Sequence, residues 1–270
     1  MRYVVNVSRI SGSVDVAALG RALYEAERDR RAIAPLTSAS PDITPEDAYA
    51  IQEAYAALRV ADGARLAGRK IGATSKAIQQ LFGIDTPDYG HVFDDMVVPD
   101  GGTIERAALI QPMVEPELAF ILDTDLAGPS VTRDDVLAVT REVIGCIEVI
   151  DSRIAEWKIA FADTVADNGS SARAVFSSDR IPIDGLDLAT VEAELVRNGE
   201  RAGVATGSAV LGHPAEAVAW LANSLGGFGR TLRAGEYVLS GSFMTAVPAE
   251  AGDTFEARFS GVGAVSCSFV

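Results

Sequence analysis

The sequence predicts an α+β fold, in which a helical N-terminal portion (residues 1–65) precedes a mixed, mostly antiparallel, rolled β core (residues 66–270). Two observations support this prediction. Helical spacing of apolar residues dominates before residue 65, and short apolar or alternating stretches typical of strands dominate after it. No internal repeat, low-complexity tract or Pro/Gly/Ser-rich linker interrupts the chain, whose 270 residues suffice for a substantial core.

Two amphipathic helices are predicted in the N-terminal portion. The first, at residues 14–31, has apolar residues at helical spacing: Val16, Leu19, Leu23 and Ala26. The second begins at Thr44, a typical N-cap, with Pro45 in its first turn and Asp47 in the position of a capping-box acid. Asp62-Gly63 ends this helix, whose apolar face comprises Ala48, Ile51, Tyr55 and Leu58.

The β core is predicted from short strands with a few helices between them. A strand at 68–72 leads into a loop at 73–75 and a short helix that ends near Gly83. Two later helices begin at Thr132 and at His213, and glycine at 226 ends the second. The clearest further strands are residues 117–122, 146–150, 237–240, 255–259 and 265–269.

Three glutamates interrupt two of these apolar strands. Glu115 and Glu117 lie two residues apart in the run 113–122, so their side chains point to the same face. Glu148 lies within the second run, 146–150. Because an unpaired buried charge costs several kcal/mol, these acids predict compensation by a hard divalent cation, Mg²⁺ or Mn²⁺. The alternative is that one or two of them are solvated acids of an edge strand.

Pro116 separates the first two glutamates. Because proline has no backbone N–H to donate to a strand ladder, it predicts that this strand lies at a sheet edge or carries a bulge. Neither arrangement changes the two-residue spacing of the carboxylates.

Composition narrows the classes of partner. The formal net charge of −15 argues against nucleic acid and against anionic membranes, since both attract basic surfaces. A small anionic substrate remains compatible with this charge, because a binding site can be locally positive.

The cysteines, histidines and termini lead to three further expectations. Cys146 and Cys267 lie in strand-like runs and are expected to be buried, reduced thiols. They and the two histidines, His91 and His213, are too scattered for the usual spacing of a zinc site.

No apolar run approaches the roughly 20 residues that span a bilayer, and residues 1–7 lack the features of a signal peptide. We therefore expect a cytoplasmic protein.

A series of short motifs, in one consistent order, resembles the hydratase/decarboxylase branch of the fumarylacetoacetate hydrolase superfamily. The motifs are KIGATSK (70–76), PDYG (87–90), EPELAF (115–120), EVIDSR (148–153), VADN (165–168), VAWLAN (218–223) and LSGS (239–242). The resemblance extends from about residue 20 to the C-terminus and implies a β-roll like the C-terminal domain of that superfamily. The spacing between DSR and VADN is most similar to that of the 2-hydroxypenta-2,4-dienoate (2-oxopent-4-enoate) hydratases, with the 4-oxalocrotonate decarboxylases as the close rival.

The resemblance assigns expected roles to five charged residues. It implies that Glu115, Glu117 and Glu148 hold the divalent cation. It also implies that Lys70 faces the active site, where it binds the substrate carboxylate or moves a proton, and that Asp88 orients water or moves a proton. By their local sequence alone, Lys70 is equally compatible with surface charge and Asp88 with an ordinary turn aspartate.

Four hydroxyl-bearing residues are candidates for substrate binding. Thr74 and Ser75 precede a predicted helix, whose N-terminus favours anions, although they are also suited to a simple helix cap. Ser240 and Ser242 flank Gly241 and are either donors to the substrate or strand-end hydroxyls without a role.

The expected activity is the hydration of 2-hydroxypenta-2,4-dienoate, or a 5-alkyl homologue, to a 4-hydroxy-2-oxo acid, in the meta-cleavage catabolism of aromatic or steroid rings. The alternatives are metal-assisted decarboxylation of 4-oxalocrotonate and a non-catalytic partner subunit. A homo-oligomer is also expected, because a helical portion beside a rolled sheet leaves apolar surface for a symmetric partner. The resemblance further suggests association with a pathway decarboxylase or aldolase.

Overall fold

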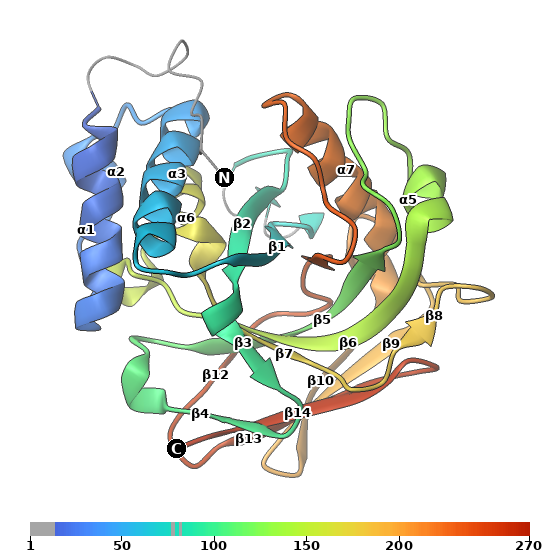
Figure 1. Ribbon diagram of the computed structural model, residues 1–270. Coiled ribbons are helices and arrows are strands. Elements are labelled where there is room, and N and C mark those ends of the chain that lie inside the picture. Colours follow the sequence, from blue (N-terminus) through green and yellow to red (C-terminus); the bar gives the residue numbers. More distant parts are fainter. Residues whose placement is uncertain (1–13, 77–78, 81–82) are drawn as a thin grey trace.

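The computed structural model describes residues 14–76, 79–80 and 83–270, and it confirms the predicted α+β architecture (Figure 1). The helices are α1 (Val16–Asp29), α2 (Leu36–Ala39), α3 (Pro45–Ala61), α5 (Arg133–Val139), α6 (Phe161–Ala166) and α7 (Pro214–Gly226). Within the described residues, none of them is long and apolar enough to cross a membrane. Residues 1–13 and part of the predicted helix before Gly83 lie outside the described residues.

Two sheets form the β core. The larger comprises β1 (Leu66–Gly72), β2 (Asp88–Phe93), β3 (Val97–Pro99), β5 (Met113–Leu122), β6 (Thr140–Ile150), β7 (Ser171–Phe176), β8 (Ile181–Pro182), β11 (Tyr237–Leu239) and β12 (Val247–Pro248). Its main path runs β2-β1-β11-β5-β6-β7-β3. The smaller has the order β10-β9-β13-β14-β4, from β4 (Gly102–Ile104), β9 (Glu192–Arg197), β10 (Glu200–Thr206), β13 (Thr254–Phe259) and β14 (Gly263–Phe269). Most pairs are antiparallel, whereas β1–β11, β3–β7 and β4–β14 are parallel.

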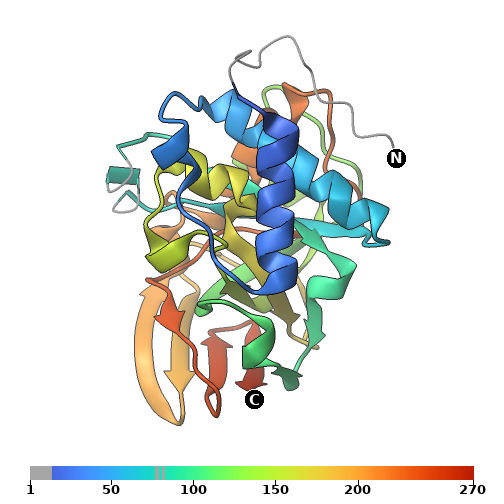
Figure 2. The ribbon, with the colours of Figure 1, turned by 90° about the vertical axis from the view of Figure 1, so that its left-hand side faces the viewer.

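The long pair β5–β6 forms the centre of the larger sheet, and its two faces have different partners. One face, with Leu118 and Phe120, packs against the smaller sheet and α7. The other face, with Ala119 and Ile144, packs against α1, α3 and α6. Figure 2 shows the N-terminal helices above the smaller sheet, and Figure 1 shows them on the opposite side of the molecule from α5 and α7.

The register of β5 and β6 places the three predicted metal ligands on the helix-covered face. Successive cross-strand rows on this face are Met113–Ile150, Glu115–Glu148, Glu117–Cys146 and Ala119–Ile144. The helices cover the Ala119–Ile144 end of this ladder. The opposite end, with Met113 and Glu115, lines a cavity.

Pro116 lies in the interior of the larger sheet, so the predicted edge or bulge is wrong. β5 pairs with β6 on one side and with β11 and β12 on the other, and its register with β6 continues unshifted through Pro116. The carbonyl of Pro116 accepts a hydrogen bond from Phe243 N at 3.2 Å, in the segment between β11 and β12. The nitrogen of Pro116 therefore faces that same segment, and no β5–β6 hydrogen bond is lost.

A buried ion pair fixes the segment that follows β6. Arg153 is 1% exposed, and its Nε donates to Oδ1 of Asp167 at 2.5 Å. The Arg153 guanidinium also donates to the carbonyls of Asp151 and Ser171, both at 3.0 Å. The other oxygen of Asp167 accepts from the Ser152 hydroxyl at 3.0 Å. This network joins the end of β6 to the segment between α6 and β7.

Removal of one partner of this buried pair should destabilise the protein strongly. Arg153→Met leaves the Asp167 carboxylate buried without its cation, and we expect the free energy of unfolding to fall by about 3–5 kcal/mol. Arg28→Met is the matched control, since Arg28 pairs with Asp29 at the exposed end of α1 and should contribute little. Denaturant titration measures both values, and equal effects would contradict the structural role of Arg153.

Candidate metal centre and active site

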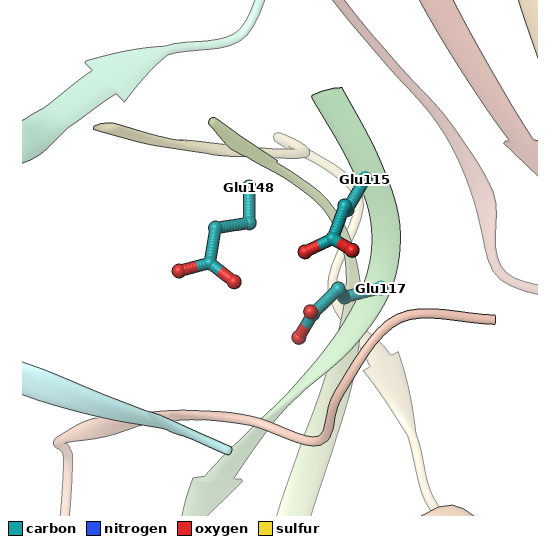
Figure 3. A group of neighbouring side chains, drawn as sticks. All are labelled: Glu115, Glu117 and Glu148. Atoms are coloured by element: carbon teal, nitrogen blue, oxygen red, sulfur yellow. The ribbon is translucent and has the colours of Figure 1, made fainter. Parts of the chain in front are cut away.

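Glu115, Glu117 and Glu148 converge on one point (Figure 3). Glu115 and Glu148 are directly opposite each other in the β5–β6 register, and Glu117 is two residues along the same face. One carboxylate oxygen from each lies within 4.8 Å of the others. Glu117 and Glu148 are fully buried, and Glu115 is half-buried at the cavity. These acids are therefore not solvated acids of an edge strand.

The electrostatics of this cluster require compensation. Burial, and then the charge of Glu148, raise the pKa of Glu115 above its usual value. Burial and the same neighbour also raise the pKa of Glu117 well above its usual value. Burial also raises the pKa of Glu148, although the adjacent Lys70 acts in the opposite direction. Like charges directly opposite each other destabilise a sheet, so three ionised carboxylates here need a cation between them.

The donor set fits Mg²⁺ or Mn²⁺. Both are hard cations that prefer carboxylate and water oxygens, and an octahedral ion with ligands at about 2.1 Å places those oxygens about 3–4 Å apart. The carboxylate oxygens of the three glutamates lie within 4.8 Å of one another, so small side-chain adjustments would bring them to this spacing. The part of the chain that the structure describes contains no other such group of His, Cys, Asp and Glu side chains.

Lys70 is buried beside the carboxylates. Its Nζ lies 3.4 Å from Oε2 of Glu148, and its side chain is 4% exposed. Burial lowers the pKa of Lys70, but the surrounding carboxylates, Glu148 and Asp88 foremost, more than offset this effect and hold the pKa above its usual value. Because the ammonium is buried against Glu148, the interpretation of Lys70 as surface charge is wrong.

Asp88 lies on the strand next to Lys70. It pairs with Gly72 across β1–β2, and a methyl group built on Gly72 would lie 2.2 Å from Oδ1 of Asp88 and 3.3 Å from Nζ of Lys70. Glycine at position 72 is therefore required for this close approach. Burial raises the pKa of Asp88, while Lys70 and hydrogen bonds from Gly72 and Thr164 act in the opposite direction. A buried carboxylate in β2 is not an ordinary turn aspartate.

The segment after β11 borders the other side of the cluster. Gly241 N donates to Oε2 of Glu117 at 2.9 Å, and the φ of +105° at Gly241 favours glycine. A methyl group at Gly241 would lie 2.5 Å from Oγ1 of Thr74, so these two segments are in close contact. The hydroxyl of Ser242 donates to the carbonyl of Met244 at 2.6 Å and faces the cavity beside Glu115.

Most of the predicted site residues line one cavity of about 1010 Å³: Lys70, Thr74, Ser75, Asp88, Glu115, Glu117 and Ser242. Glu148 lies beneath this lining, in contact with Lys70. Ser240 differs, because it is fully buried and outside the lining, and its backbone N–H donates to the carbonyl of Leu118 at 2.9 Å. The roles of these residues toward a substrate stay predictions.

The cavity also has walls that the sequence analysis did not identify. Apolar side chains line it from several segments: Met113, Ile150, Trp157, Ile159, Phe243 and Met244. Pro35, Thr37 and Ser38 line it from the helical N-terminal portion. Met113 and Ile150 were detectable in principle, because they lie two residues from metal-ligand candidates on the same strands. Phe243 and Met244 were also detectable in principle, because they directly follow the LSGS motif. The other lining residues named here lie outside the quoted motifs.

Comparison with known proteins confirms the family. Residues 70–270 match the family model described as fumarylacetoacetate (FAA) hydrolase C-terminal. The chain belongs to this family, whose fold the structure has.

Relatives with assigned activities are similar over nearly the whole chain. The 2-hydroxyhexa-2,4-dienoate hydratase of Comamonas testosteroni is 49% identical over 252 residues, which are 93% of this chain and 96% of that protein. The 2-keto-4-pentenoate hydratase of Paraburkholderia xenovorans (strain LB400) is 44% identical over 249 residues, which are 92% of this chain and 93% of that protein. The solved structure of 4-oxalocrotonate decarboxylase from Pseudomonas putida G7, complexed with magnesium and adipate, has a TM-score of 0.92 at 36% identity. The match covers 94% of this chain and 97% of that one.

Each carboxylate should be needed for metal binding. Glu115→Gln, Glu117→Gln and Glu148→Gln each delete one ligand charge with little change in shape, so we expect magnesium affinity to fall by at least about 10-fold and most activity to be lost. Calorimetric titration with Mg²⁺ measures the affinity. Glu142→Gln, at the far end of β6 and paired with Arg180, is the control. Full turnover in excess chelator would overturn the metal assignment.

Lys70 should matter far more than its neighbour. Lys70→Met removes the ammonium but keeps the aliphatic chain, and we expect kcat to fall by roughly 10²–10⁴, as is typical for loss of an acid–base group. Arg69→Met removes the adjacent buried charge from the opposite face of β1 and should change kcat much less. Steady-state kinetics of both variants, with circular dichroism to verify folding, test this. Similar small effects would show that Lys70 has no part in the chemistry.

Proposed function

We propose that this chain is a hydro-lyase that adds water to a short 2-hydroxy-2,4-dienoate and forms a 4-hydroxy-2-oxo acid, in the catabolism of aromatic or steroid rings. The observation that carries the proposal is a cavity with a buried ammonium, a buried aspartate and two carboxylates in its lining, and with the third convergent carboxylate directly beneath it. The similarity to relatives named as hydratases of such compounds supports it.

The reaction consists of two steps, an isomerisation and an addition of water. In the first, the dienol loses the proton of its 2-hydroxyl group and gains one at C5, which gives a 2-oxo-3-enoate. In the second, water adds its oxygen at C4 and a proton at C3. Bound Mg²⁺ or Mn²⁺ would stabilise the negative charge that develops on the 2-oxygen of the substrate.

The chain's own residues would handle the protons and the substrate carboxylate. Lys70 is buried with its Nζ 3.4 Å from Glu148, where its ammonium is suited to donate a hydrogen bond or a proton. Asp88 is suited to accept a proton, since burial raises its pKa. Thr74 and Ser75 have hydroxyl groups that can hold the substrate carboxylate at the cavity wall, whereas Ser242 would have to release the carbonyl of Met244 to do so.

The wall next to the metal ligands favours a substrate with a single carboxylate. Met113 and Ile150 form the next row on the same face of β5–β6, about 7 Å beyond Glu115 and Glu148. A dienoate bound through its carboxylate and 2-oxygen extends about 5 Å to C5, so its far end can lie over this apolar row. Among the described lining residues the cations are Lys70 and Lys158, and Lys158 pairs with Glu156 at 2.5 Å with both side chains 71% exposed.

Decarboxylation is the second candidate. It is supported by the structural similarity to 4-oxalocrotonate decarboxylase, which was solved with adipate, a dicarboxylate. The same metal site can stabilise the dienolate that remains after carbon dioxide leaves. A non-catalytic subunit is less consistent with a complete set of carboxylates and a buried lysine. Assembly into a homo-oligomer, alone or with a pathway decarboxylase or aldolase, stays a prediction.

Product analysis distinguishes the two candidates. With Mg²⁺, 2-hydroxypenta-2,4-dienoate should give the 4-hydroxy-2-oxo acid, while 4-oxalocrotonate should release carbon dioxide with a kcat/KM at least about 100-fold lower. The physical reason is that an unpaired carboxylate against an apolar wall costs a few kcal/mol. Chromatography with mass detection and a carbon dioxide assay measure both reactions. Faster release of carbon dioxide than hydration would identify a decarboxylase instead.

A further inference from the structure

The turn between α6 and β7 has an unusual backbone. Asn168, Gly169 and Ser170 all have left-handed φ angles, of 57°, 57° and 58°. This conformation is easy for glycine and tolerable for asparagine, but it costs roughly 1–2 kcal/mol for a residue such as serine. Three such residues in a row persist only where the surrounding structure fixes them, and strain of this kind is concentrated at functional sites.

The side chain of Asn168 holds this turn on β2. Its Oδ1 accepts a hydrogen bond from His91 N at 2.7 Å, and its Nδ2 donates to the carbonyl of His91 at 2.9 Å. Both groups of the amide thus bind the backbone of one strand residue. The adjacent Gly90 permits this contact, because a methyl group there would lie 2.2 Å from the carbonyl oxygen of Asn168.

The turn at residues 168–170, which Asn168 holds on β2, lies over Lys70. Gly90 is the cross-strand partner of Lys70 in the β1–β2 register, so the turn sits above that pair. A methyl group built on Gly169 would lie 3.3 Å from Cδ, Cε and Nζ of Lys70, which places Gly169 in contact with the end of that side chain. On the turn's other flank, Asp167 is fixed by the buried Arg153.

We propose that Asn168 is a positioning residue for Lys70: its amide holds the left-handed turn in place, and Gly169 thereby holds the ammonium between Glu148 and Asp88. This inference rests on the proposed role of Lys70 in the reaction. Asn168 is not among the residues that line the cavity, so it would act through the lysine alone. A misplacement of a reacting group by about 1 Å can cost on the order of 100-fold in rate.

Asn168→Gly is the decisive variant, because glycine keeps the left-handed backbone at little cost but removes the amide. We expect kcat to fall by about 10–100-fold with KM within about 3-fold of its original value. Gln52→Met is the matched control. The buried Gln52 amide also donates two hydrogen bonds to backbone carbonyls, of Tyr89 at 2.8 Å and Val165 at 2.7 Å, neither of which belongs to the turn at residues 168–170.

The control separates positioning from general stability. Both variants lose at least two buried hydrogen bonds, so both should lower Tm, but only Asn168→Gly should lower kcat strongly. If Asn168→Gly retains kcat, the asparagine serves only the backbone conformation and the proposal fails. If Gln52→Met loses as much kcat as Asn168→Gly, the effect is one of stability, which also overturns the proposal.

A double mutant tests whether Asn168 acts through Lys70. If it does, adding Asn168→Gly to Lys70→Met should lower kcat by no more than about 3-fold beyond Lys70→Met alone, because the positioned group is already absent. Multiplication of the two single effects would show an independent role for Asn168 and overturn the inference.

Amine labelling provides a readout that does not depend on turnover. The sequence has three lysines, Lys70, Lys76 and Lys158, of which Lys70 is buried and Lys158 is exposed. Acetic anhydride labelling, quantified by peptide mass spectrometry, should modify Lys70 at least about 5-fold faster relative to Lys158 in Asn168→Gly than in the original protein. Unchanged protection of Lys70 would overturn the positioning role. If protection is lost but Lys70→Met is fully active, the proposed function of Lys70 fails instead.

Discussion

The constraint on which the site depends is the opposition of Glu115 and Glu148 across two central strands, with Glu117 one pleat farther along. Three carboxylates in such a position repel one another and lose most of their hydration, so the surrounding structure must supply positive charge and donors. The chain supplies the Lys70 ammonium and the N–H of Gly241, and the donor set itself fits a divalent cation. The register of β5 and β6 is thus a chemical requirement as well as a structural one.

Glycines make the dense packing around this cluster possible. The missing side chain leaves room for a neighbour at three positions: for the carboxylate of Asp88 at Gly72, for the end of Lys70 at Gly169, and for Thr74 at Gly241. A methyl group at Gly72 or Gly241 would collide with Asp88 or Thr74, and one at Gly169 would require the end of Lys70 to shift slightly. The charged residues can therefore approach one another closely only because three segments, far apart in the sequence, each lack a side chain at the point of contact. Glycine loses more conformational entropy on folding than other residues do, and the rigid positioning of the side chains in the site offsets this cost.

The helical N-terminal portion does more than cover the sheet. Its helices pack on the same face of β5–β6 that carries the carboxylates, and α2 contributes to the cavity wall through Pro35, Thr37 and Ser38. Thr37 binds Asp163 of α6 through both its backbone N–H and its hydroxyl, at 3.1 and 2.7 Å. Residues from both predicted portions, 1–65 and 66–270, therefore line the cavity, although the matched family model begins at residue 70.

The sequence by itself determined the fold class, the capped helices and the carboxylate pair, because capping boxes, alternation along strands and two-residue spacing are local properties. Thr44 with Asp47 and Thr132 with Asp135 form the capping boxes that their spacing predicts. Tertiary structure alone decided that Pro116 lies in an interior strand, that Ser240 lies outside the cavity lining, and that Asn168 binds His91. Each of these depends on strand register or on contact between distant segments, and local sequence does not specify which segments meet.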